Sequence, residues 1–264
     1  MKNAPLFLLL CGLCMPGALA QPFDKPSEQV LIPLYRSSPL PGANGSLWIT
    51  ELSVYNASEH PVEWSQGLFC GIPEGCPDAL LPGKAFGQIS LLTHALLPHQ
   101  GSEAFLYLVN PGGPKVHLNL RVRDISRART DAGTEIPVIR EADALTGDTH
   151  LLNIPTDGSS RVTLRLYDFE GRHGPQVFVE VASPTGVILH SEVVTLLFGG
   201  AWTNERYPPY PSVAVVFGLE QIGIQNGTET VRVRLEPVEP GMRYWAFATV
   251  TNNETQHVTT ITPQ

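Results

Sequence analysis

Among the residues of this sequence, Cys70 and Cys76 have the types and the spacing that most clearly suggest side-chain chemistry. They bracket residues 71–75, GIPEG, whose proline and glycines are typical of a loop. In an oxidising compartment, two cysteines this close in sequence favour a small disulfide loop. A metal site is the alternative, but it would need more ligands, and the nearby His94 and His99 match no known ligand spacing. We therefore expect a Cys70–Cys76 disulfide, no metal site and no cofactor.

A second candidate is the aromatic and proline-rich stretch of residues 201–211, AWTNERYPPYP. Its prolines would present Trp202, Tyr207 and Tyr210 on a stiff, extended loop. Rings displayed in this way stack on sugar faces or anchor a protein partner. The alternative is a crossover whose rings cover the end of a hydrophobic core. We take these three aromatic residues as candidates for a binding site.

Catalytic signatures are absent from the sequence. It contains no glycine-rich phosphate loop, no HExxH, no pair of CxxC motifs and no GxSxG turn. Residues 42–46, GANGS, resemble a nucleophile loop, but they precede a predicted strand rather than a helix, which favours a plain turn. No placement of acidic residues proposes a catalytic pair. We name no catalytic residue.

The charge balance disfavours nucleic acid as a partner. The chain has 17 Lys and Arg against 25 Asp and Glu, a formal net charge of −8. Residues 121–129, RVRDISRAR, are the one candidate basic patch. Alternation places Arg121 and Arg123 on the polar face of a strand and Arg127 and Arg129 in a polar connector, so we interpret the stretch as solvated surface.

The N-terminal residues predict export. Lys2, an apolar run over residues 6–13 and small residues at 18–20 are typical of a cleaved secretory signal over residues 1–20. The apolar run is too short for a transmembrane helix, and no later run reaches the required length. We expect a secreted or periplasmic product with no membrane span.

Alternation with a period of two dominates the rest of the chain. In residues 161–167, RVTLRLY, apolar and polar side chains fall on opposite faces, and residues 117–123 and 230–236 repeat the pattern. A half-buried strand collects apolar residues on one face, whereas a helix would scatter them. Further strands are predicted over residues 30–35, 46–55, 62–69, 103–109, 177–182, 187–196, 213–217 and 244–251. A helical turn is expected only over residues 87–97.

Many short strands between glycine and proline turn signals predict an all-β fold of two immunoglobulin-like antiparallel β-sandwich domains. The polar stretch of residues 126–134 is the expected junction, which gives domains at 21–134 and 135–264. A phrase recurs in the two halves, as VYNASEHPV at 54–62 and VTNNETQHV at 250–258. Asparagine caps turns and tolerates left-handed backbone angles. We interpret each copy as a strand, a turn and a second strand, the same local hairpin used twice.

Together with the signal peptide, VTNNETQHV and LSVYNASEHPVEW resemble secreted bacterial proteins built from immunoglobulin-like modules. The resemblance implies adhesion, surface assembly or binding. The segment ITELSVYNASEHPVEW is also similar to early strands of periplasmic pilus chaperones, which implies an Arg and a Lys in the cleft between two domains. No basic residue matches either role, and residues 135–143, EIPVIREAD, depart from the alternating strand of those chaperones.

The leading hypothesis is a non-enzymatic extracytoplasmic binding or structural module. Recognition would use loops at the sandwich ends or strand addition at an exposed edge. Its partner would be a protein or carbohydrate of the envelope or extracellular space. The alternatives are a polysaccharide-acting hydrolase of the envelope, which predicts a deep pocket with titratable groups, and a pilus-chaperone-like protein, which predicts a basic cleft.

Overall fold

The computed structural model describes residues 27–34, 39–66, 79–88, 104–109, 115–126, 132–169, 174–198, 212–219, 224 and 230–264. Over these ranges the chain forms 19 strands and two 3-10 turns, and no α-helix. The strand pairings there are antiparallel. The predicted all-β antiparallel class is therefore confirmed.

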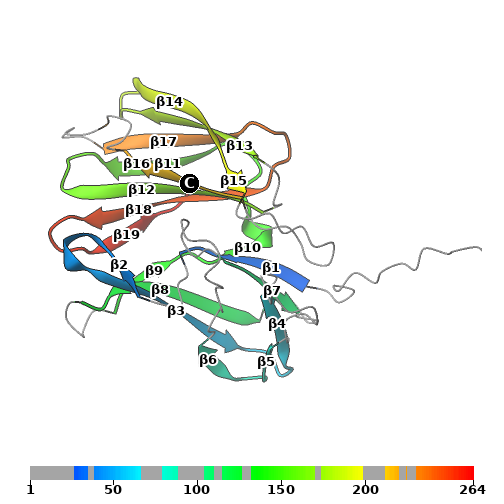
Figure 1. Ribbon diagram of the computed structural model, residues 1–264. Coiled ribbons are helices and arrows are strands. Elements are labelled where there is room, and N and C mark those ends of the chain that lie inside the picture. Colours follow the sequence, from blue (N-terminus) through cyan, green and yellow to red (C-terminus); the bar gives the residue numbers. More distant parts are fainter. Residues whose placement is uncertain are drawn as a thin grey trace, which may run out of the picture.

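The first half of the chain forms two sheets, drawn in the lower part of Figure 1. One sheet has the order β10 (Ile139–Arg140), β1 (Ser27–Ile32), β7 (Ala104–Val109), β4 (Val62–Gln66) and β5 (Ala79–Leu81). The other has the order β2 (Leu40–Pro41), β3 (Leu47–Asn56), β8 (Val116–Asp124) and β9 (Thr134–Ile136), with β6 (Phe86–Gln88) also paired to β3. The turn η1 (Ala43–Gly45) joins β2 to β3.

The second half also forms two sheets, and it is drawn above the first half in Figure 1. The outer sheet has the order β11 (Thr149–Pro155), β17 (Thr230–Pro237), β13 (Gln176–Ala182) and β14 (Ile188–Thr195). The sheet nearer the first half has the order β15 (Leu197–Phe198), β16 (Ser212–Gly218), β12 (Ser160–Asp168), β18 (Tyr244–Asn252) and β19 (Val258–Ile261). The turn η2 (Glu141–Asp143) follows β10.

Alternation predicted the long strands because one face of each strand is buried. In β12, Val162, Leu164 and Leu166 are buried, while Thr163 and Arg165 between them are half-buried. Each predicted strand range overlaps an observed strand. Of the predicted helical turn at 87–97, the first two residues belong to β6 and the others lie outside the described ranges.

Two hydrophobic cores form, one in each half. The first lies between the two sheets of the first half, and its members include Leu31 and Leu120. It also contains Tyr167, Phe169 and Phe247 from the second half. The two halves are thus joined by continuous apolar packing.

Strand pairing in the first half continues past the junction expected at residue 134. β9 pairs with β8, and β10 pairs with β1. Arg140 of β10 forms an ion pair with Glu28 and donates a hydrogen bond to the Val116 carbonyl. Residues from the far side of the polar stretch therefore complete both sheets of the first half.

The two copies of the repeated phrase fold differently. β18 and β19 pair with each other, so the second copy is the predicted hairpin. β3 and β4 belong to different sheets, so the first copy is a crossover and its prediction as a hairpin is wrong. The reason is tertiary: Asn56, at the end of β3, is fully buried, and besides accepting the Ser58 backbone N–H in a local turn it donates to carbonyls around the β5–β6 turn.

Two of the sequence predictions cannot be compared with the structure here, because their residues lie outside the described ranges. They are the secretory signal over residues 1–20 and the Cys70–Cys76 disulfide. Within the described ranges, no helix has the length and apolar character needed to cross a membrane.

Candidate functional site

The predicted aromatic binding site lies outside the part of the chain that the structure describes. Trp202, Tyr207 and Tyr210 fall between the end of β15 and the start of β16. Their role as a binding site therefore stays a prediction.

The predicted solvated stretch begins on β8. Arg123 forms an ion pair with Glu51 of β3 at 2.7 Å. Arg121 donates hydrogen bonds to Asn119 Oδ1 and to the Ala132 carbonyl. Both guanidinium groups are thus used within the first half. Arg127 and Arg129 lie outside the described ranges.

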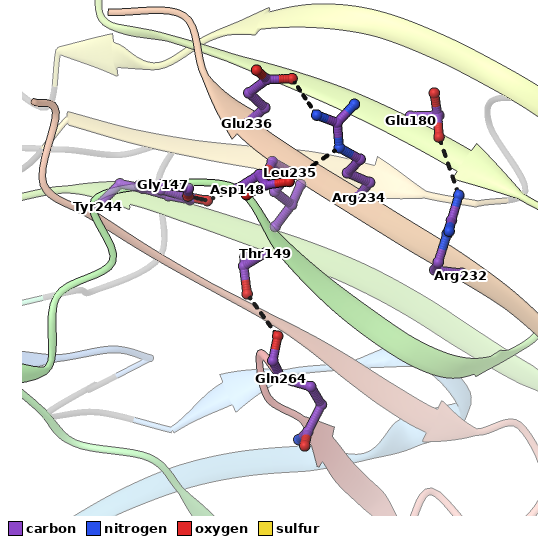
Figure 2. A network of polar contacts seen from close by, with 10 residues as sticks. All are labelled: Gly147, Asp148, Thr149, Glu180, Arg232, Arg234, Leu235, Glu236, Tyr244 and Gln264. Atoms are coloured by element: carbon purple, nitrogen blue, oxygen red, sulfur yellow. Dashed lines mark hydrogen bonds and ion pairs between the residues drawn. The ribbon is translucent and has the colours of Figure 1, made fainter. Parts of the chain in front are cut away.

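Charged side chains on the outer sheet of the second half compensate one another (Figure 2). Arg232 of β17 pairs with Glu180 of β13 at 3.3 Å. Arg234 lies between Asp148, at 3.6 Å, and Glu236, at 2.7 Å. Because each cation has an acidic partner, this network is a surface ladder that stabilises the sheet modestly rather than a binding site.

A cavity of about 210 Å³ lies between the two halves, and we call it the interdomain cavity. Its lining residues include members of β2, β9, β18 and β19, four strands that Figure 1 labels. Its first-half wall consists of Leu34, Leu40, Trp48, Ile49, Thr50, Val122 and Ile136. Its second-half wall consists of Arg161, Arg165, Thr249, Thr251 and Val258. One wall is therefore mainly apolar, and the other is cationic and hydroxylic.

The strand register explains the polar wall. Arg161 lies opposite Thr251 in the β12–β18 pair, and Arg165 lies on the same face of β12. This is the face turned away from the second core, where Val162 and Leu164 are buried. The polar face of this alternating strand therefore meets the first half.

Arg161 is held in a fixed position by the turn of the second phrase. Its Nη1 donates to Asn253 Oδ1 at 2.8 Å, and its Nη2 donates to Gln256 Oε1 at 2.9 Å. Gln256 is buried and has a left-handed backbone with φ of 59°. That conformation costs a non-glycine residue about 1 kcal/mol or more. The turn therefore holds a strained residue whose side chain orients Arg161.

Trp48 forms part of the opposite wall. Its Nε1 donates to Ser46 Oγ at 2.9 Å. A Cβ atom at Gly42 would lie 2.4 Å from the same Nε1, so any side chain there would displace the indole. Trp48 lies within the predicted strand of residues 46–55, and its half-buried ring lines the cavity. Trp245, by contrast, is partly buried and packs against the first core.

The described lining residues of the interdomain cavity offer cationic, hydroxyl and apolar groups. Its described lining residues include no acidic side chain, histidine, cysteine or serine that could act as an acid, base or strong nucleophile. They include two arginines and no lysine, whereas the resemblance to pilus chaperones implies one of each. Within the described ranges, no group of three or more His, Cys, Asp or Glu side chains could hold a metal ion.

A second candidate surface is the edge strand β14. It pairs with β13 and forms one end of its sheet. Its side chains are unusually exposed for a strand: Ile188 is 59% exposed, Leu189 48% and Val193 51%. Exposed apolar side chains along an edge provide a template for pairing with another strand.

The inner face of β14 carries a histidine and a glutamate at the sheet edge. His190 lies opposite Val181, and Glu192 lies opposite Val179, two core residues of β13. His190 Nε2 and Glu192 Oε1 are 3.6 Å apart. A bulge at Leu189 interrupts the regular pairing with β13. Inward charges and bulges restrict which strands can pair at an edge.

Comparisons with family models, with curated proteins and with solved structures found no match. The proposals below therefore rest on the geometry of the described residues.

Local sequence patterns missed the role of Arg161, because it occupies an ordinary polar position in an alternating strand. They predicted the strand over residues 187–196 but not its position at the sheet edge, because an edge strand and a central strand alternate in the same way.

Proposed function

We propose that this protein is a non-enzymatic structural and binding module of the extracytoplasmic space, built from two immunoglobulin-like β-sandwiches. It joins its partner by strand addition at β14. The observation that carries the proposal is the exposure of Ile188, Leu189 and Val193 on a strand that ends its sheet. Strand addition satisfies the backbone groups of such an edge and covers its apolar side chains. The predicted secretory signal supports the location.

The edge is selective because of its charges. A purely apolar strand laid beside β14 would bury His190 and Glu192 without compensation, at a cost in desolvation. A strand that presents an acid opposite His190 and a base opposite Glu192 would avoid that cost. The partner must therefore be complementary in charge at two positions that lie two residues apart.

A second copy of this chain meets that requirement. If a two-fold axis perpendicular to the sheet relates the two copies, their β14 strands pair antiparallel. Inner-face residues of one copy then lie opposite inner-face residues of the other. A register centred on Ser191 places His190 of each copy opposite Glu192 of the second copy. It also places Leu189 opposite Val193, so that exposed apolar side chains cover one another. Registers centred on His190 or Glu192 would oppose two identical side chains.

Sedimentation velocity of the chain from Gln21 tests this assembly over a range of concentrations. We expect a monomer–dimer equilibrium in the micromolar to millimolar range, because one strand pair is smaller than a standard interface. His190→Glu places two carboxylates opposite each other and should abolish the dimer. Adding Glu192→Lys to that variant restores complementarity and should restore the dimer.

Glu135→Lys is the matched control, because it changes the charge of an exposed residue on β9 and should leave the equilibrium unchanged. Thermal unfolding of each variant confirms that it folds. A parent chain that stays monomeric at millimolar concentration would contradict the proposal. So would a His190→Glu variant that dimerises like the parent.

A further inference from the structure

We propose that the interdomain cavity binds a compact organic carboxylate with an apolar body. This site lies between the two halves and is separate from β14, so the inference does not depend on strand addition. It follows from three features of the cavity: an oriented positive charge, an apolar wall and a small volume.

The charge is that of Arg161. Its two hydrogen-bond partners, Asn253 and Gln256, are neutral amides that orient the guanidinium group without cancelling its charge. Among the described residues, no carboxylate pairs with Arg161. A half-buried cation in a fixed geometry favours an anionic ligand, and its planar fork suits a carboxylate.

The hydroxyl groups beside Arg161 extend the polar end of the site. Thr251 lies directly opposite Arg161 in the sheet, and Thr249 is two residues away on the same face of β18. Both line the cavity, and a hydroxyl group can donate a further hydrogen bond to a carboxylate oxygen. Arg165 also lines the cavity, farther along β12. The polar wall thus provides donors for an anionic group.

The opposite wall determines the rest of the ligand. Apolar side chains from four strands and one connector form it, among them Ile49, Val122 and Ile136, and the Trp48 ring lies beside them. Apolar ligand atoms that cover this wall would remove both surfaces from water. An inorganic anion would leave the wall uncovered. A sugar would need more partners for its hydroxyl groups than the threonines provide.

The volume limits the ligand to a small molecule. About 210 Å³ holds roughly seven waters and is below the roughly 300–1,000 Å³ of pockets for drug-sized ligands. A single aromatic ring or a short branched chain with one carboxylate group fits this limit. Benzoate is therefore a suitable probe.

The test is a titration of the chain from Gln21 with benzoate, followed by the NMR signal of the Trp48 indole N–H, which Trp48→Phe assigns. We expect saturable shifts with a dissociation constant on the order of millimolar or tighter, given so few ligand atoms. Benzyl alcohol lacks the charge and sulfate lacks the apolar body. Each should bind at least roughly tenfold more weakly.

Arg161→Gln removes the charge and should weaken benzoate binding roughly tenfold or more. Arg123→Gln is the matched control, because Arg123 is ion-paired to Glu51 outside the cavity lining, and it should bind benzoate like the parent. Thr251→Leu, which fills the cavity from the strand opposite Arg161, should block binding even if Arg161→Gln fails to fold.

Four results would overturn the proposal. Benzoate could fail to shift the Trp48 signal at tens of millimolar. Benzyl alcohol could bind as tightly as benzoate, which would indicate a neutral apolar void. Sulfate could bind as tightly, which would indicate an anion site alone. Finally, folded Arg161→Gln or Thr251→Leu could bind benzoate like the parent.

Discussion

At the scale of single residues, asparagine serves two roles in the repeated phrase. Asn252 Oδ1 accepts hydrogen bonds from the backbone N–H groups of Glu254 and Thr255, which is the predicted turn role. Asn56 Oδ1 accepts the Ser58 backbone N–H in a similar turn, but Asn56 is also fully buried, and its Nδ2 donates to the distant carbonyls of Leu81 and Pro82. The turn role was predictable because its partners are adjacent in sequence. The buried role was not, because Leu81 reaches Asn56 only after the chain has folded.

Tyr244 provides a prediction about pH. Its buried hydroxyl donates to the Gly147 carbonyl at 2.8 Å (Figure 2). Burial, followed by the charges of Asp148 and Glu236, raises the pKa of this hydroxyl well above its ordinary value. The folded state therefore keeps its proton when the unfolded state has lost it. The resulting stability is fully present below the unfolded pKa of about 10 and is lost as the pH rises further.

We expect the free energy of unfolding to fall by about 1.4 kcal/mol per pH unit above pH 10 for this proton alone. Urea denaturation between pH 8 and pH 12 measures it. Tyr244→Phe should cost roughly 1–2 kcal/mol at neutral pH and show a shallower decline above pH 10. Tyr55→Phe, at an exposed tyrosine, should keep the parent slope. Equal slopes for Tyr244→Phe and the parent would contradict the prediction.

At the scale of elements, the length of a strand determined whether it could be predicted from the sequence. Long strands such as β12 and β18 show a period of two and were recognised from it. β5, β6, β9 and β10 have two or three residues each, which is too short to show a period. They become strands because longer neighbours offer backbone donors and acceptors. Ile139 of the two-residue β10 nonetheless belongs to the first core and is 3% exposed.

Ile139→Ala should lower the free energy of unfolding by about 2–4 kcal/mol, because it removes buried methylene groups from the first core. Urea denaturation followed by circular dichroism measures the change. Ile188→Ala, the same substitution at an exposed position on β14, should stay within roughly 0.5 kcal/mol of the parent. A small effect at Ile139 would mean that β10 does not help to hold the first half together.

At the scale of the whole molecule, the two halves share apolar packing. Tyr167 and Phe247 stack with ring centroids 6.1 Å apart and planes 7° apart. They lie on strands β12 and β18 of the second half, yet they belong to the first core. Gln29 also donates a hydrogen bond to the Phe169 carbonyl across the same boundary. We therefore expect the halves to unfold as one unit.

Phe247→Ala should separate the two halves energetically. The parent chain should show one calorimetric transition, whereas the variant should show two, with a loss of about 3–5 kcal/mol in the first half. Val179→Ala, in the second core, is the control and should lower stability without splitting the transition. Two transitions in the parent chain, or one in the Phe247→Ala variant, would contradict a shared core.

The sequence by itself determined the all-β class and the long strands, because alternation and turn residues act between near neighbours in the chain. Only the tertiary structure decided which polar faces meet water and which strands end a sheet. Arg161 and Arg232 occupy equivalent positions in alternating strands. Arg232 pairs with Glu180 on the outer sheet, whereas Arg161 faces the first half across the interdomain cavity. The physical reason is that faces and edges are assigned by contacts between distant segments, which no local pattern encodes.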